Sequence, residues 1–146
     1  MTLQEIKDIC LKNNIKVTGD FIEFNKSTPN FQLTKNFKLQ EFLTKNTKDT
    51  HTIISLKIIL ELQILRTLFG SPVAISSSYR SVSYNRSVGG ATASAHIKGL
   101  ALDCYPINGD IKSWFNIVFN NKKTGGIGQY ATFVHIDVAN TRFWRG

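Results

Sequence analysis

The sequence predicts an α+β domain in which a small central antiparallel sheet is flanked by helices. The chain has 146 residues, of which 42% are hydrophobic, so one domain with one core is expected. Segments with helical spacing of apolar residues lie between short alternating segments, without an internal repeat. The last two alternating segments follow a glycine-rich stretch and read as a hairpin, which favours antiparallel pairing.

Four segments have the apolar spacing of helices, and they cover residues 2–13, 36–43, 53–69 and 111–120. The strongest is 53–69, which ends before Gly70, a residue typical of helix ends. Its apolar residues include Leu56, Ile59, Leu60, Ile64, Leu65 and Leu68. In the last helix the residues expected to face inward are Trp114, Phe115, Val118 and Phe119.

Strands are expected where β-branched and apolar residues alternate or form a short run. The predicted strands are a hairpin over 15–24 around Gly19, then 73–76, 101–104 and a final hairpin of 127–130 with 133–138. The stretch 25–36 reads as loop, and 77–100 reads as mostly irregular. The end, residues 141–144, is expected to pack against the sheet.

The net charge of +8 favours polyanionic partners, such as nucleic acid or an anionic bacterial cell wall. The lysines are scattered, and no aromatic-basic platform or recognition helix appears, so nucleic acid is not the expected partner. No apolar run is long enough to span a membrane, and residues 1–5 do not begin a secretory signal. Cys10 and Cys104 are expected to be buried free thiols.

Two separated stretches carry the polar groups that suggest chemistry. The first, residues 94–103, contains His96 and Asp103, and Asp103 lies in an apolar run where a carboxylate is costly to bury unless it is paired or metal-bound. The second, residues 133–138, alternates as a strand does, so His135 and Asp137 share one face. Two histidines and a carboxylate form the ligand set of a catalytic zinc site. A purely structural hydrogen bond between a histidine and an aspartate is the alternative reading.

The motifs resemble a known family. Residues 76–104, SSSYRSVSYNRSVGGATASAHIKGLALDC, closely resemble zinc D-alanyl-D-alanine carboxypeptidases and related peptidoglycan endopeptidases, whose clan includes lysostaphin-like enzymes and the hedgehog domain. Residues 125–144, GGIGQYATFVHIDVANTRFW, resemble the C-terminal signature of that family. The resemblance implies a hedgehog-like fold whose central sheet carries one Zn²⁺. It covers 36–146 as a zinc peptidase-like domain and leaves 1–35 as an unassigned N-terminal helix and extension.

Carried over to this chain, the resemblance implies that His96, Asp103 and His135 bind the zinc ion. Ser94 matches a serine before the first ligand, where it supports the loop and borders the substrate. Arg80 matches an arginine that receives a substrate carboxylate, a task that suits its planar fork of donors. The alternative for Arg80 is a tie between loop and sheet.

The chain departs from the family pattern at two places. Ser78 stands where the family usually has glycine, so a positive φ angle there would be strained. Phe133 and Thr132 stand where many members of the clan carry a basic or acidic side chain that takes a proton. Asp137 is then the candidate for a general base, and the favoured alternative is that it orients His135.

Two aromatic residues, Tyr130 and Trp144, are candidates for lining a substrate groove, although packing is the commoner role of large aromatics. The resulting hypothesis is a zinc peptidase that hydrolyses peptidoglycan stem or cross-link peptides at the bacterial cell wall. Because no signal is expected, delivery by phage or prophage lysis or within a virion fits. The alternative is a non-catalytic, zinc-containing module that binds cell wall or serves as a virion component.

Overall fold

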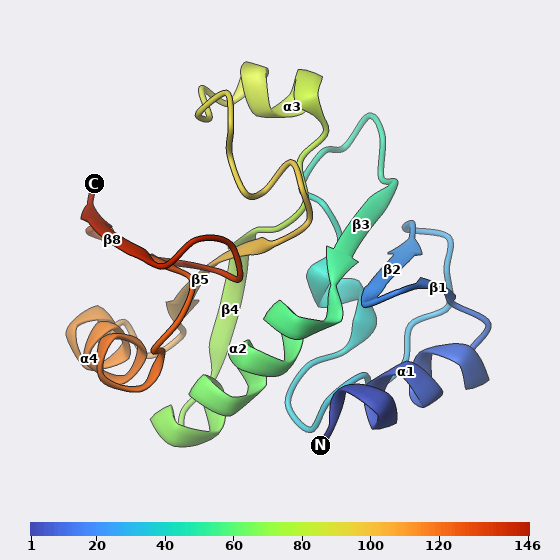
Figure 1. Cartoon of the computed structure of the whole chain (residues 1–146), viewed down its shortest axis with the longest axis horizontal. Helices are drawn as coiled ribbons and strands as arrows, with labels where there is room; N and C mark the ends of the chain where they lie inside the picture. The colour runs from blue at the N-terminus through green and yellow to red at the C-terminus, as the bar shows by residue number, and fades with distance from the viewer.

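The computed structural model describes residues 1–146 and has the predicted α+β architecture, with two sheets and several helices (Figure 1). Its elements are α1 (Leu3–Lys12), β1 (Lys16–Thr18), β2 (Phe21–Phe24), the 3₁₀ helix η1 (Leu39–Phe42), β3 (Thr52–Ser55), α2 (Leu56–Phe69), β4 (Val73–Ser77), α3 (Val82–Ser87), β5 (Ala101–Pro106), α4 (Ile111–Asn121), β6 (Gly126–Gln129), β7 (Val134–Asp137) and β8 (Arg142–Arg145).

The main sheet has five strands in the order β4-β5-β7-β6-β8. The pairs β4–β5, β5–β7 and β6–β7 are antiparallel, and β6–β7 is the predicted final hairpin. The end of the chain does more than pack against the sheet, because β8 pairs with β6 in parallel and forms one edge. Alternation puts Leu102 and Cys104 of β5 into the core, so the neighbouring Asp103 points to the other face.

The smaller sheet has the order β1-β2-β3 and contains the predicted hairpin around Gly19, whose φ of 60° suits glycine. The start of the predicted helix 53–69 is wrong, since Thr52–Ser55 form β3 against β2. Three of these residues are β-branched, which favours a strand. Ser55 then caps α2 by accepting a hydrogen bond from the Lys57 backbone N–H, and Gly70 ends the helix at φ 78°.

The core is a single cluster of 24 buried residues that joins both sheets to α1, α2 and α4. Trp114 and Val118 of α4 are fully buried, as predicted. Phe119 is 48% exposed, so its predicted inward position is wrong, and it packs with Phe115 and Phe143 at the surface. Ile64 of α2 is likewise exposed, because α2 presents one side to solvent.

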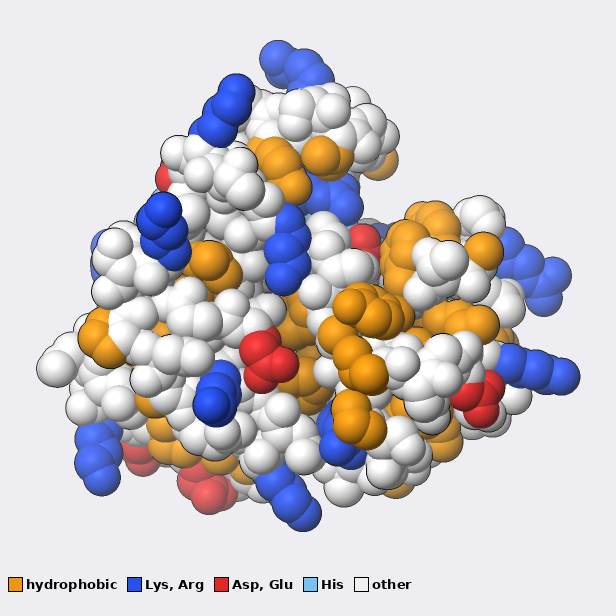
Figure 2. Space-filling view, turned by 180° about the vertical axis from the view of Figure 1, so that it is seen from behind, with side chains coloured by type: hydrophobic (Ala, Val, Ile, Leu, Met, Phe, Trp, Pro, Cys, Tyr) orange, Lys and Arg blue, Asp and Glu red, His pale blue; other side chains and the backbone are white.

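The N-terminal segment packs into this core. Ile6 and Cys10 of α1 have no exposed surface, and β2 supplies the buried Ile22 next to Ile54 of β3. Both cysteines are buried and free. Lys and Arg side chains lie scattered over the face seen in Figure 2 and form no single block. None of the helices has both the length and the apolar character needed for a membrane crossing.

A matched pair of α1 variants tests whether residues 1–35 fold together with the remainder. Ile6→Ala should lower the free energy of unfolding by about 2–5 kcal/mol, because it leaves a cavity in the shared core. Leu11→Ala, at a position that is 57% exposed, should change it by less than about 0.5 kcal/mol. Denaturant unfolding followed by tryptophan fluorescence measures both, since Trp114 lies far along the chain. An unchanged tryptophan transition in Ile6→Ala would mean that the segment unfolds independently.

Candidate metal centre

The pairing of β5 with β7 sets Asp103 directly opposite His135. Both side chains point away from the core face of the sheet into a pocket on the other face. There Asp103 is 5% exposed and His135 is 7% exposed. His135 Nδ1 lies 2.9 Å from Asp103 Oδ1. The register of two neighbouring strands therefore builds this half of the site.

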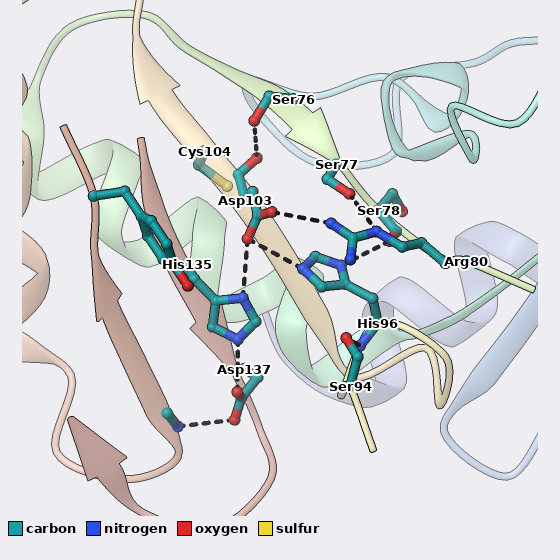
Figure 3. Close-up of polar contacts among 12 residues, drawn as sticks. Ser76, Ser77, Ser78, Arg80, Ser94, His96, Asp103, Cys104, His135 and Asp137 are labelled. Atoms are coloured by element: carbon teal, nitrogen blue, oxygen red, sulfur yellow. Dashed lines mark hydrogen bonds and ion pairs between the residues drawn. The ribbon is translucent and has the colours of Figure 1, made fainter. Parts of the chain in front are cut away.

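His96 reaches the same carboxylate oxygen from a tight turn before β5. Its Nε2 lies 3.1 Å from Asp103 Oδ1 (Figure 3). The turn needs Gly99, whose φ is 68° and whose missing Cβ would lie 2.5 Å from the Ile53 carbonyl oxygen. Ser94 stabilises the turn, because its hydroxyl accepts a hydrogen bond of 3.2 Å from the His96 backbone N–H.

In each histidine the ring nitrogen that points away from Asp103, here called the outer nitrogen, faces a group that can only accept a hydrogen bond. His96 Nδ1 lies 2.8 Å from the Ser78 carbonyl oxygen, and His135 Nε2 lies 2.8 Å from Asp137 Oδ2. Both outer nitrogens therefore carry protons and donate. In the neutral rings the inner nitrogens, His96 Nε2 and His135 Nδ1, then direct lone pairs at the carboxylate of Asp103.

Three such groups that converge in a buried place can hold a cation between them. The three atoms that could bind a metal lie within 4.8 Å of one another. Two imidazoles with one carboxylate match the ligands that zinc prefers. The residues present therefore fit a zinc ion. The pKa directions show that positive charge is favoured at this point: burial opposes ionisation of Asp103, yet its contacts with the imidazoles of His135 and His96 hold its pKa well below the usual value. Burial also opposes the charged form of His135, but Asp103 and Asp137 raise its pKa.

Asp137 lies behind His135, on the side away from Asp103 (Figure 3). It has no exposed surface. The backbone N–H groups of Gly126 and Ala139 donate to its Oδ1 at 2.8 and 3.0 Å, and Arg142 donates to both oxygens. Burial raises the pKa of this carboxyl, but hydrogen bonds from His135 and Arg142 lower it more. This arrangement lets Asp137 hold the ring of His135, while Asp137 itself stays outside the cavity.

Arg80 lies beside the cluster. Its Nη2 is 3.6 Å from Asp103 Oδ2, its Nε donates to Ser77 Oγ at 3.1 Å, and its Nη1 donates to Asn85 Oδ1 at 3.1 Å. Arg80 therefore makes the structural ties of the alternative and also lies at the cluster, whereas its binding of a substrate carboxylate stays a prediction.

Ser78 is not strained, contrary to expectation, because its φ angle is not positive. Its hydroxyl donates to the Phe42 carbonyl at 2.7 Å. The carbonyl of the same residue accepts the hydrogen bond from His96 Nδ1. Serine at this position therefore ties η1 to the segment after β4, whose backbone contacts the first histidine.

A cavity of about 510 Å³ opens over His96, Asp103 and His135. Figure 2 shows a hollow beneath the projecting lobe that carries α3. One wall is the loop 88–95, and the other contains Tyr130, Phe133 and Trp144. Trp144 Nε1 donates to the Tyr130 hydroxyl at 2.9 Å, and the Trp144 ring lies 5.0 Å from the His135 ring. Both predicted groove residues therefore border the cavity.

Two residues at the site were not singled out from the sequence, Asn85 and Arg142. Asn85 belongs to the short helix α3, which was read as irregular. Arg142 belongs to β8, whose pairing with β6 was not foreseen. The alternation of Arg142 and Trp144 on one strand was the available signal, since both side chains turn toward β7.

Comparison with known proteins gives one family. The model of the peptidase M15 family matches residues 35–137, which is more than half of the chain and includes all three converging residues. No curated protein matches the chain. The matched region begins before η1 and ends at the last residue of β7, so it contains β3 to β7. The chain belongs to the peptidase M15 family, a family of zinc-dependent metallopeptidases.

Proposed function

We propose that the protein is a zinc-dependent peptidase that hydrolyses stem or cross-link peptides of peptidoglycan, as a D-Ala-D-Ala carboxypeptidase or an endopeptidase. One observation carries the proposal: three proton-accepting atoms, His96 Nε2, Asp103 Oδ1 and His135 Nδ1, converge at the floor of an open cavity. Two imidazoles and one carboxylate in such a place are the ligand set of a catalytic zinc site.

In this proposal His96, Asp103 and His135 hold one zinc ion. Zinc in such a site polarises a carbonyl and lowers the pKa of water to about 7. The chain supplies the orientation of the ligands, because the Ser78 carbonyl and the Asp137 carboxylate fix the tautomer of each histidine. The cavity walls limit access of bulk water to the reacting peptide.

Substrate recognition falls to the residues around the floor. Arg80 would bind a carboxylate of the peptide, since its side chain is 16% exposed at the edge of the cavity. Tyr130 accepts a hydrogen bond from Trp144, so its own O–H is left to donate to a peptide carbonyl. Ser94 borders the cavity beside His96 and shapes the turn.

Asp137 would act as a positioning residue and not as the general base. Its two oxygens are occupied by the His135 ring, the Arg142 guanidinium and two backbone N–H groups. It also does not line the cavity. A base must lie within hydrogen-bond reach of the proton that it takes, and Asp137 is separated from the substrate by the His135 ring.

The positive charge of the chain supports action at an anionic bacterial wall, an attraction that salt should weaken. Delivery through phage or prophage lysis, or as part of a virion, fits a small basic peptidase. A non-catalytic zinc module that binds the wall is the second candidate. The observation that favours it is the lack of a second carboxylate that could act as general base in the cavity. Besides Asp103, the proposed metal ligand, the ionisable residues that line the cavity are Arg80, His96, Tyr130, His135 and Arg142.

Metal binding is the first test. The purified protein should bind one zinc ion per chain, and zinc should raise its melting temperature, because the ion binds only the folded site. His96→Ala and His135→Ala should each lose the ion. His51→Ala, at an exposed histidine outside the cluster, should keep it. Elemental analysis after dialysis gives the stoichiometry, and full zinc retention by His135→Ala would contradict the ligand assignment.

Turnover is the second test. Zinc-loaded protein incubated with peptidoglycan, or with an acyl peptide that ends in D-Ala-D-Ala, should release fragments with new termini that mass spectrometry can identify. A chelator and His135→Ala should each abolish the products, because both remove the ion. The fragment masses also identify the bond that is cut. Intact substrate in the presence of fully loaded protein that still binds the wall would favour the binding module.

Asp137→Asn separates the two roles of this carboxylate. If Asp137 only orients His135, the variant should bind zinc about 10–100-fold more weakly but cut substrate once zinc is saturating. If it were the base, saturating zinc would not restore turnover. A zinc titration of kcat distinguishes these outcomes, and a loss of kcat equal to that of His135→Ala at every zinc concentration would return Asp137 to the catalytic role.

A further inference from the structure

The lobe that projects over the cavity comprises residues 82–95, and Asn85 is its one buried polar residue. It lies on α3 and is 3% exposed. Its side-chain Oδ1 accepts from Arg80 Nη1 at 3.1 Å, and its Nδ2 donates to the Ala91 carbonyl at 2.9 Å. Because a guanidinium can only donate and a carbonyl can only accept, these partners fix the orientation of the amide.

The same residue holds the loop that forms one cavity wall. The Gly90 backbone N–H donates to the Asn85 carbonyl at 2.9 Å. A Cβ at Gly90 would lie 2.1 Å from Asn85 Oδ1 and 2.9 Å from Arg80 Nη1. The loop can therefore approach these two side chains this closely only with glycine at position 90. Asn85 therefore connects Arg80, on one side, with residues 90 and 91 of the wall, on the other.

The contacts of Arg80 leave part of its guanidinium unused. A guanidinium has five N–H donors. Ser77 and Asn85 each take one, and the ion pair with Asp103 at 3.6 Å takes at most one more. At least two donors remain, on a side chain that borders the cavity. Ser77 stands opposite Asp103 because of a bulge in β4, so Ser77 and Asp103 act from the sheet and Asn85 acts from the lobe.

From this geometry we infer that Asn85 is a positioning residue that sets the recognition of a substrate carboxylate by Arg80. Without the amide oxygen, the guanidinium is held only from the sheet side and can turn toward Asp103. Its free donors then no longer point together at a carboxylate, and bidentate pairing depends on that alignment. The inference rests on the proposed function, because it takes Arg80 to be the group that binds the peptide carboxylate.

The test compares two ligands that differ only in one charge. Calorimetry measures the binding of an acyl-D-Ala-D-Ala peptide with a free C-terminal carboxylate and of the same peptide as its amide. The wild-type protein should prefer the acid by about tenfold to a hundredfold, the usual effect of a charge-assisted pair. Arg80→Ala should remove the preference. Asn85→Ala should reduce it about tenfold while the affinity for the amide changes by less than about twofold.

Two further variants make the result specific. Asn85→Asp keeps the volume and the acceptor but places a carboxylate next to Arg80, so it should also reduce the preference for the acid, by competing for the guanidinium. Arg86→Ala removes a positive charge from the neighbouring exposed position on α3 and should leave the preference as in the wild type. Circular dichroism confirms that each variant is folded.

The outcomes separate this inference from the proposed function. Equal losses of affinity for acid and amide in both Asn85 variants would show a merely structural role and overturn the inference. An unchanged ratio, or a wild-type protein without preference for the acid, would overturn it as well. None of these results concerns whether zinc-loaded protein cuts peptide bonds, which the digest decides independently.

Discussion

The convergence of three electron-pair donors on one point is the constraint that the surrounding structure satisfies. Asp103 and the two histidines are buried and mutually close, although an uncompensated carboxylate in such a place is costly. A neighbour of each ring orients it so that His96 Nε2 and His135 Nδ1 face Asp103. Ser78, the residue after β4, does so through its carbonyl, and Asp137 of β7 does so through its carboxylate. One support is thus a backbone carbonyl and the other is a buried side chain on the sheet.

A second feature is that the last strand contributes beyond the region matched by the family model. Arg142 pairs with Asp137 through both oxygens, and Trp144 lies against the ring of His135 and donates to Tyr130. The parallel pairing of β8 with β6 makes these contacts possible. One edge strand therefore supports the second histidine and also forms part of the cavity wall.

Much of this arrangement could be predicted because it follows from local pattern. The alternation in 133–138 placed His135 and Asp137 on one face, and the final hairpin and the turn at Gly19 formed as expected. The errors arose where long-range pairing decides. Thr52–Ser55 could extend a helix, but they pair with β2. Phe119 lies at the surface beside Phe143 of β8, a strand that was not predicted. Asn85 gave no signal, since its partners are set by the loop that follows it.

The dependence of the site on strand pairing links the metal to folding accuracy. In a strand the side chains alternate between faces, so a slip of one residue between β5 and β7 would turn Asp103 or His135 toward the apolar layer. Misregistered chains would then lack a complete ligand set and could not retain the ion. Zinc would bind only molecules in which β5 and β7 pair in the correct register. By mass action it would therefore shift the folding equilibrium toward that register.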